Sequence, residues 1–176
     1  MNGESTISRR LSFNMIDGTM GETLRQWKPF VLAEMAPVLD GFYDHVSKFS
    51  ETSTFFKNRA HMMHAKDMQL KHWAIILDGR FDSVYESSVT KIGEVHNKLG
   101  LEPRWYIGGY GLIVETLVRG LVTDMLAEWA AAEKPGLFGR RPETAEIADR
   151  MSRALAAMSK AVMMDIDVAV TVYSTA

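Results

Sequence analysis

The chain has 176 residues, which is the size of one domain and enough to enclose one hydrophobic core. Its 20 basic and 22 acidic residues leave a net charge of −2, which gives no electrostatic basis for binding nucleic acid or an anionic membrane surface. The absence of cysteine excludes disulfides, iron–sulfur clusters and thiolate ligation of a metal. The sequence shows neither a signal peptide nor a membrane span, so we expect one cytoplasmic domain over residues 1–176.

Apolar residues recur at helical spacing along the whole chain, and no segment alternates as a strand does, which predicts an all-α protein. After a short N-terminal segment, Asp17 predicts the start of a helix, and Pro29 predicts the first turn of the next helix, at about 30–49. Residues 50–54 are predicted as a polar connection, whose Ser53 or Thr54 would cap a helix over about 55–77.

The next predicted helix covers about 81–99 and ends at Gly100, with His96 in its last turn. Pro103 then begins a helix that continues to about residue 133, residues 134–142 form a loop, and a final helix covers about 143–172. At about 1.5 Å per residue each of these last two helices is roughly 45 Å long, more than a compact monomer needs. We therefore expect them to extend into a dimer interface.

The residues that carry chemistry are few. The five histidines, at positions 45, 61, 64, 72 and 96, lack cysteine or carboxylate partners at the spacing of a zinc site. No Ser/His/Asp arrangement, glycine-rich phosphate loop or buried carboxylate pair stands out, so we expect no catalytic activity in this chain. From its position alone, His96 is more commonly a charge partner of a helix C-terminus than a ligand.

The residues that follow His96 narrow this choice. The pattern H-x-x-x-G-L-E-P-R-W-Y, from His96 to Tyr106, resembles the segment after the proximal histidine of globin-coupled sensors. Further segments resemble that family without obvious gaps, so that the resemblance covers most of the chain: Phe42-Tyr43, Gln69-x-x-His72-Trp73 and Gly79-x-Phe81-Asp82. It implies a globin-like fold of the globin-coupled sensor type, with the long C-terminal helices forming the bundle of a homodimer.

The same resemblance implies one non-covalent b-type haem and a role in sensing oxygen, with carbon monoxide and nitric oxide as further gases. His96 would be the proximal iron ligand and Tyr43 the distal hydrogen-bond donor to oxygen. The remaining residues expected to contact the haem are Phe42, Ala65, Met68, His72, Trp105 and Tyr106. Relatives commonly carry leucine or a hydroxyl residue at the positions of Ala65 and Met68, so we expect no second polar donor there.

Several alternatives stay open from the sequence. A distal histidine, at position 61, 64 or 72, could ligate the iron when gas is absent. The chain is expected to signal to a C-terminal output domain outside it, such as a diguanylate cyclase, a histidine kinase or a chemotaxis transducer. A stand-alone protein that resembles protoglobins, with gas-binding or haem redox function, is the main alternative. A helical interaction module without haem is the third.

Overall fold

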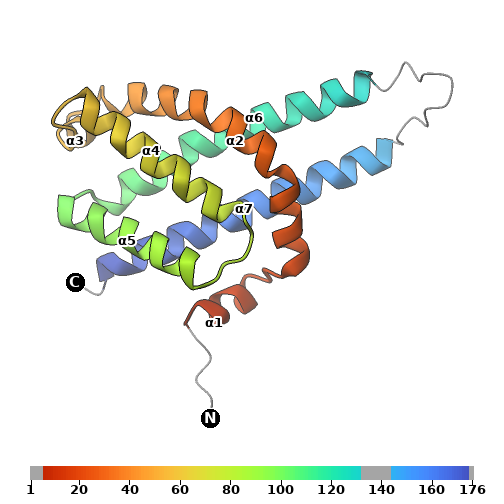
Figure 1. Ribbon diagram of the computed structural model, residues 1–176, viewed down its shortest axis with the longest axis horizontal. Helices are drawn as coiled ribbons and strands as arrows, with labels where there is room; N and C mark the ends of the chain where they lie inside the picture. The colour runs from red at the N-terminus through yellow and green to blue at the C-terminus, as the bar shows by residue number, and fades with distance from the viewer. Residues whose placement is uncertain (1–5, 132–143, 175–176) are drawn as a thin grey trace, which may run out of the picture.

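The computed structural model describes residues 6–131 and 144–174, and all secondary structure in this part of the chain is helical (Figure 1). This confirms the predicted all-α class. The helices are α1 (Thr6–Phe13), α2 (Gly18–Val46), α3 (Ser50–Ser53), α4 (Arg59–Ile76), α5 (Ser83–Leu99), α6 (Pro103–Ala131) and α7 (Thr144–Ser174).

The N-terminal half differs from the sequence prediction at one boundary. A single helix, α2, replaces the two helices predicted on either side of Pro29, and both Pro29 and Pro37 lie inside it. Proline lacks the backbone N–H and its ring displaces the carbonyl one turn earlier, so it bends a helix that tertiary packing holds together. The ribbon of α2 is visibly bent (Figure 1). The expected start at Asp17 is confirmed, since its side chain accepts a hydrogen bond from the Met20 amide.

The predicted cap of the following helix was wrong. Residues 50–53 form the short helix α3, and α4 begins only after Asn58, whose side chain accepts a hydrogen bond from the His61 amide. Asparagine is as good an N-cap as serine, and the sequence offers both within a few residues. The end of α5 was predicted correctly, because Gly100 adopts the left-handed conformation with φ of 77°.

Close backbone contacts at glycine fix how the helices pack. A Cβ atom on Gly93 of α5 would lie 2.5 Å from the carbonyl oxygen of Ala169 in α7, so these two helices touch backbone to backbone. A Cβ atom on Gly21 of α2 would lie 2.3 Å from the carbonyl oxygen of Gly79, in the turn between α4 and α5. A larger residue at Gly21 or Gly93 would separate the elements that these contacts join.

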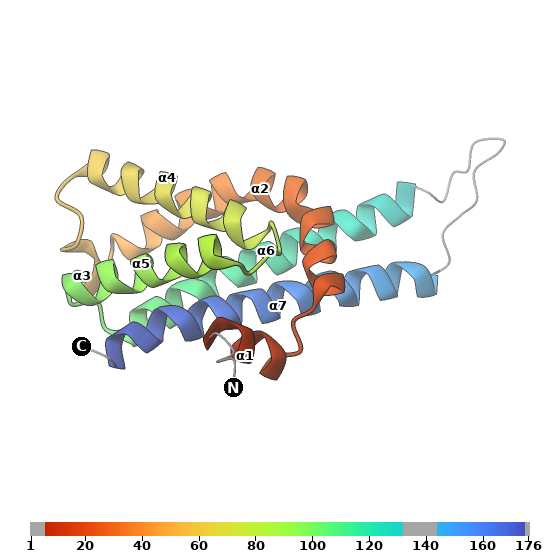
Figure 2. The ribbon, with the colours of Figure 1, turned by 60° about the horizontal axis from the view of Figure 1, so that its bottom comes forward.

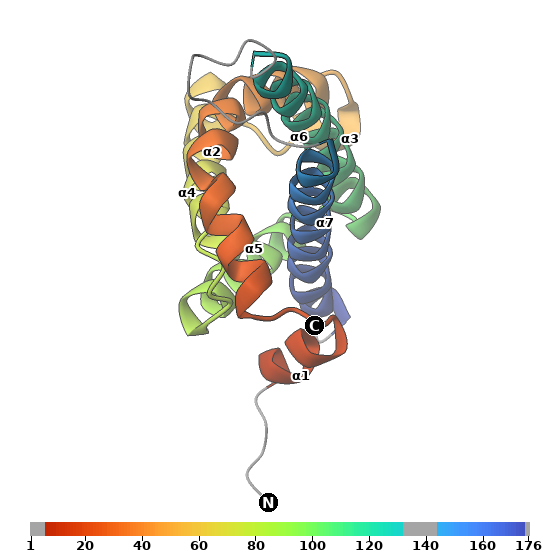
Figure 3. The ribbon, with the colours of Figure 1, turned by 90° about the vertical axis from the view of Figure 1, so that its right-hand side faces the viewer.

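Helix α1 lies across the C-terminal part of α7 (Figures 2 and 3). The Arg10 side chain forms an ion pair with Asp167 at 2.7 Å and donates a hydrogen bond to Thr171 at 2.8 Å. Ile7 is buried in the main hydrophobic core, and Leu11 packs against it. The two ends of the described chain are therefore packed together.

The second half of α6 and the first half of α7 project past the other helices as an antiparallel pair (Figures 1 and 2). A small second core, formed by Leu121, Met125 and Ala154, holds this pair together and contacts Trp27 and Phe30 of α2. The predicted loop at 134–142 lies outside the described residues. Within the described ranges, no helix is both long and apolar enough to span a membrane.

Candidate functional site

His96 lies in the last turn of α5 and is partly buried. Its Nδ1 donates a hydrogen bond to the carbonyl oxygen of Ile92 at 2.8 Å, which places the ring proton on Nδ1 and the lone pair on Nε2. No described residue bonds to Nε2. Burial also lowers the pKa of His96 below its ordinary value, because the charged imidazolium is poorly solvated there, and the hydrogen bond to Ile92 opposes this only in part. His96 is thus a neutral, oriented imidazole with an available nitrogen.

The start of α6 supplies the surroundings of this imidazole. The ring of Tyr106 contacts the His96 ring edge to face, with centroids 5.2 Å apart. Beside it, Trp105 packs against Phe49, and the Arg104 guanidinium lies over its indole. The indole Nε1 of Trp105 is buried and has no hydrogen-bond partner among the described residues. Trp105, the neighbour of Tyr106 in sequence, therefore has an indole N–H without an acceptor in the described part of the chain.

A second group of predicted residues gathers around Tyr43 of α2, which is buried. Its ring contacts Phe42 at 5.1 Å and Phe56 at 5.7 Å, both edge to face. The Tyr43 hydroxyl donates to the side-chain oxygen of Gln69 in α4 at 3.0 Å. Burial raises the pKa of Tyr43 above its ordinary value, because a phenolate would lose its hydration. The phenol accordingly stays protonated and remains a hydrogen-bond donor.

Helix α6 connects the His96 group with the Tyr43 group. A Cβ atom on Gly109 would lie 3.2 Å from the ring of Phe42, so that ring rests directly on the backbone of α6. Tyr106, which contacts His96, precedes Gly109 by three residues, and three residues of helix cover only about 4.5 Å. The aromatic contact of His96 and the ring of Phe42, the neighbour of Tyr43, therefore lie about one turn apart along α6.

The antiparallel helices α4 and α5 differ at their two ends. The end near their connecting turn is closed by buried side chains, namely Trp73, Ile76, Leu77, Phe81 and Tyr85. Large apolar side chains are exposed at Val84 near the turn (62%), at Met68 in the middle of α4 (48%), and at Val95 and Leu99 beside His96 (48% and 47%). Ala65 is partly buried and packs against the main core. Val95 and Leu99 thus add exposed apolar area next to His96, which a large planar group could cover.

His72, which was predicted to contact the cofactor, is buried in the core and bonds to the Asp165 carboxylate that Tyr106 also approaches. It is 3% exposed, its Nδ1 is 2.9 Å from the Ser88 hydroxyl, and its Nε2 is 2.8 Å from the Asp165 carboxylate. Both ring nitrogens are thus engaged within the protein. His61 and His64, the other open choices for a distal ligand, are exposed at the start of α4, and Nδ1 of His61 accepts from the Lys57 amide.

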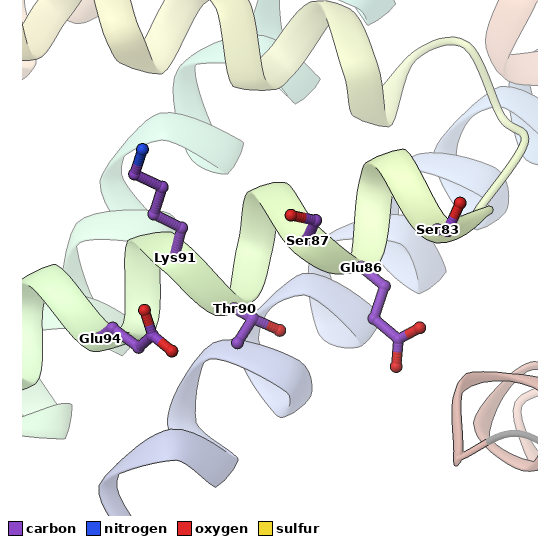
Figure 4. A pocket seen from close by; sticks show the side chains of 6 residues that line it. All are labelled: Ser83, Glu86, Ser87, Thr90, Lys91 and Glu94. Carbon is purple, nitrogen blue, oxygen red and sulfur yellow. The ribbon is translucent and has the colours of Figure 1, made fainter.

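A surface pocket follows α5 but contains none of the predicted site residues (Figure 4). Its six lining residues all belong to that one helix: Ser83, Glu86, Ser87, Thr90, Lys91 and Glu94. Because no side chain of a second element faces them across the pocket, this surface lacks the enclosure of a small-molecule site.

The sequence interpretation missed two residues. Gln69 was noted only as part of the motif that includes His72 and Trp73, and no role was predicted for it. In the structure it accepts the hydrogen bond of the Tyr43 hydroxyl. Asp165 passed unnoticed in α7, where the run from Ala161 to Ile166 is otherwise mostly apolar. A lone carboxylate on the apolar face of a helix was the available signal, because a buried charge requires partners.

Comparison with known proteins finds relatives that match nearly the whole chain. The heme-based aerotactic transducer HemAT of Halobacterium salinarum is 27% identical over 171 residues, which is 97% of this chain. The matched part is 33% of the relative, so this chain spans about a third of that protein.

Solved structures match over nearly the whole chain. The globin domain of the Geobacter sulfurreducens globin-coupled sensor has a TM-score of 0.77 at 16% identity, covering 97% of this chain and 99% of that domain. The ferric globin domain of E. coli DosC has a TM-score of 0.59 at 14% identity, covering 95% and 98%. The fold is thus that of a sensor globin domain. The Protoglobin family profile matches residues 3–176, and the chain belongs to that family.

Proposed function

We propose that this chain is the gas-sensing domain of a globin-coupled sensor and binds one b-type haem with His96 as the protein ligand to the iron. The observation that carries the proposal is the state of the His96 ring. Its Nδ1 hydrogen bond to Ile92 fixes the tautomer, and Nε2 is left without a protein partner. Histidine ligands of metals commonly bond in this way through their second nitrogen.

The residues around His96 fit a haem. The exposed apolar side chains of Met68, Val95 and Leu99 supply a surface for the porphyrin, and the unpaired indole nitrogen of Trp105 supplies a donor for a polar group at its edge. With no cysteine the chain cannot form the thioether links of a c-type haem, so the cofactor is haem b. When bound, this group supplies an iron with one coordination position open to oxygen, carbon monoxide or nitric oxide.

Tyr43 is the residue we assign to gas discrimination. Its buried phenol retains its proton, and a phenol O–H stabilises a ligand that carries partial negative charge. Oxygen gains more from such a donor than carbon monoxide does. Phe42 and Phe56 hold the Tyr43 ring from two sides and limit its motion. Ala65 and Met68 remain candidates for lining the distal side, while the contacts of His72 support a role away from the gas.

The signal would leave through a domain beyond this chain. The related HemAT is an aerotactic transducer three times as long as the matched region, which favours an output domain such as a chemotaxis transducer. A diguanylate cyclase or a histidine kinase is the other candidate class. We further propose that the sensor is cytoplasmic and acts as a homodimer.

Replacing His96 tests the proposal. The wild-type chain should bind one haem per chain, and His96→Gly should weaken haem binding by more than the roughly 10- to 100-fold that loss of an outer-shell partner costs. Added imidazole should restore a histidine-type absorption spectrum in this variant. His64→Ala, an exposed residue of α4, is the matched control and should bind haem as the wild type does.

Two results would overturn the assignment. An unchanged proximal-histidine spectrum in His96→Gly without imidazole would show that another residue ligates the iron. A wild-type chain that fails to bind haem at all would favour the haem-free interaction module.

A further inference from the structure

Asp165 is the one acidic residue that is fully buried within the described chain, with an exposed fraction of 0%. It lies in α7 between Met164 and Ile166, where an apolar residue would pack without any polar partner. Burying a carboxylate is costly unless hydrogen-bond donors replace its water. The side chains that donate hydrogen bonds to Asp165 are therefore the ones whose positions this carboxylate can fix.

Three donors converge on Asp165 from two other helices. His72 of α4 lies against Oδ1, with its Nε2 at 2.8 Å. The hydroxyl of Tyr110 in α6 donates to Oδ2 at close range. The hydroxyl of Tyr106, one turn earlier in α6, reaches the same oxygen only at 3.5 Å. Tyr106 is thus the loosest of the three contacts and the one that a small displacement would make or break.

Tyr106 also contacts His96, the central residue of the functional site. Its ring centroid is 5.2 Å from that of His96, whereas no ring contact joins His96 to Tyr110. One side chain therefore contacts both the imidazole of α5 and, through its hydroxyl, the buried carboxylate of α7. The His96 ring therefore packs against a side chain whose hydroxyl lies 3.5 Å from Oδ2 of Asp165.

A second contact joins the same two helices one turn away. Gly93 precedes His96 by three residues, and its Cα faces the backbone of Ala169, which follows Asp165 by four. Because there is no side chain between the two backbones at that level, α5 cannot shift far without α7. Helix α7 is thus contacted on two neighbouring turns: at Asp165 by the Tyr106 side chain and at Ala169 by the backbone of Gly93.

We infer that Asp165 is a positioning residue for His96: through Tyr106 it sets the orientation of the imidazole, and it is the group by which α7 responds when that imidazole moves. The inference rests on the proposed function for the role of His96 as a ligand. The positioning itself is a property of the protein side chains alone. It is therefore measurable with and without haem.

The exchange of the His96 Nδ1 proton with solvent, followed by NMR in the chain without added haem, reports how firmly the ring is held. Both Asp165→Asn and Tyr106→Phe should speed this exchange by about 2- to 10-fold, as expected for the loss of one long hydrogen bond of ordinary strength. Leu117→Ala is the control, because it creates a cavity in the same helix α6, at a buried position away from His96. It should lower stability without changing the exchange.

A double-mutant cycle separates positioning from general loosening of the core. If Asp165 acts through the Tyr106 hydroxyl, Asp165→Asn should add nothing to the exchange rate once Tyr106→Phe is present. Equal effects of Asp165→Asn in both backgrounds would overturn the inference, as would an unchanged rate in Asp165→Asn. Should Asp165→Asn fail to fold, an unchanged exchange rate in Tyr106→Phe alone would overturn it.

The haem-loaded protein supplies an independent readout. The iron–histidine stretching band in the resonance Raman spectrum of the ferrous protein should shift in Asp165→Asn and in Tyr106→Phe, and should keep its position in Leu117→Ala. If the chain binds no haem, the proposed function fails while the proton-exchange measurement still decides the inference. If haem binds through His96 but neither readout responds to Asp165→Asn, the proposed function stands and the inference is wrong.

Discussion

The Tyr43 hydroxyl already has an acceptor, and this affects how it can serve a bound gas. It donates its single proton to Gln69, so it must give up that hydrogen bond to donate elsewhere. The side chain of Gln69 therefore competes with the gas for one proton. Such competition makes Gln69 a determinant of oxygen affinity.

Opposite changes at the two residues test this competition. Tyr43→Phe should raise the oxygen dissociation rate by about 10- to 100-fold, the equivalent of a hydrogen bond to a charged group. Gln69→Leu should lower it by about 2- to 10-fold, because the phenol loses its competing acceptor. Flash photolysis and stopped-flow measurements on both gases provide the check, and carbon monoxide release should change much less. A faster oxygen release in Gln69→Leu would mean that Gln69 assists the donor instead.

The depressed pKa of His96 predicts a pH dependence of stability in the haem-free chain. Its folded-state pKa lies below the ordinary value of 6.5, so the unfolded chain takes up the proton more readily. The contribution of this group to the free energy of unfolding should be fully present above about pH 6.5 and should decline as the pH falls below it. Urea unfolding between pH 5 and 8 measures this decline.

His96→Gln is the reference for that series, since it removes the titrating group and leaves the other histidines unchanged. Its free energy of unfolding should fall less steeply below pH 6.5 than that of the wild type. Parallel curves for the two proteins would show that His96 does not carry the effect.

How much of the site the sequence predicts differs from one residue to the next. The motif from His96 to Tyr106 was sufficient to single out His96 and its aromatic neighbour, because a short segment carries both. The partners of His72 were not predictable, since Ser88 and Asp165 reach it from helices 16 and 93 residues away in the sequence. Periodicity shows that a residue is buried, but which polar group it meets depends on how the helices pack.

At the scale of elements, helix type was predictable and helix boundaries were less so. The existence of α4 to α7 follows from apolar periodicity, and the structure has all of them. The break at Pro29 was wrong because packing of α2 against its neighbours outweighs the local cost of proline. The short helix α3 was missed because its four residues are too few to show a period.

The contact between α5 and α7 is sensitive to a single methyl group. Gly93→Ala places a Cβ atom 2.5 Å from the Ala169 carbonyl oxygen, so the helices must separate, and we expect a loss of about 1–3 kcal/mol in the free energy of unfolding. Gly41→Ala in α2 is the matched control, because nothing lies within 4 Å of its added Cβ atom. It should leave stability unchanged or raise it by about 0.5–1 kcal/mol. Urea denaturation of both variants makes the comparison, and equal stabilities would contradict the backbone contact.

At the scale of the whole molecule, the projecting pair formed by α6 and α7 predicts association of two copies. Two helices alone enclose only a small core, and Leu126, in the projecting half of α6, is 49% exposed. In a homodimer the pair would become half of a four-helix bundle, which buries such side chains around a two-fold axis.

Sedimentation of the haem-loaded protein at tens of micromolar should therefore show a dimer, and Leu126→Glu should convert it to a monomer. Val84→Glu, at an apolar and still more exposed position on α5, is the control and should remain dimeric. A monomeric wild type at this concentration would count against the prediction. Dissociation of both variants would place the interface elsewhere.

Because α1 packs on α7, it can reach its final position only after α7 has been synthesised. Arg10 and Thr171 are separated by 161 positions, so a growing chain produces the two at very different times. At about 5–20 residues per second, α1 waits about 8–30 s after its own synthesis before its partner surface exists. During that interval Ile7 and Leu11 have no completed core to enter. Of the described helices, α1 is thus synthesised before all the others but can pack in its final position only after α7 has been made.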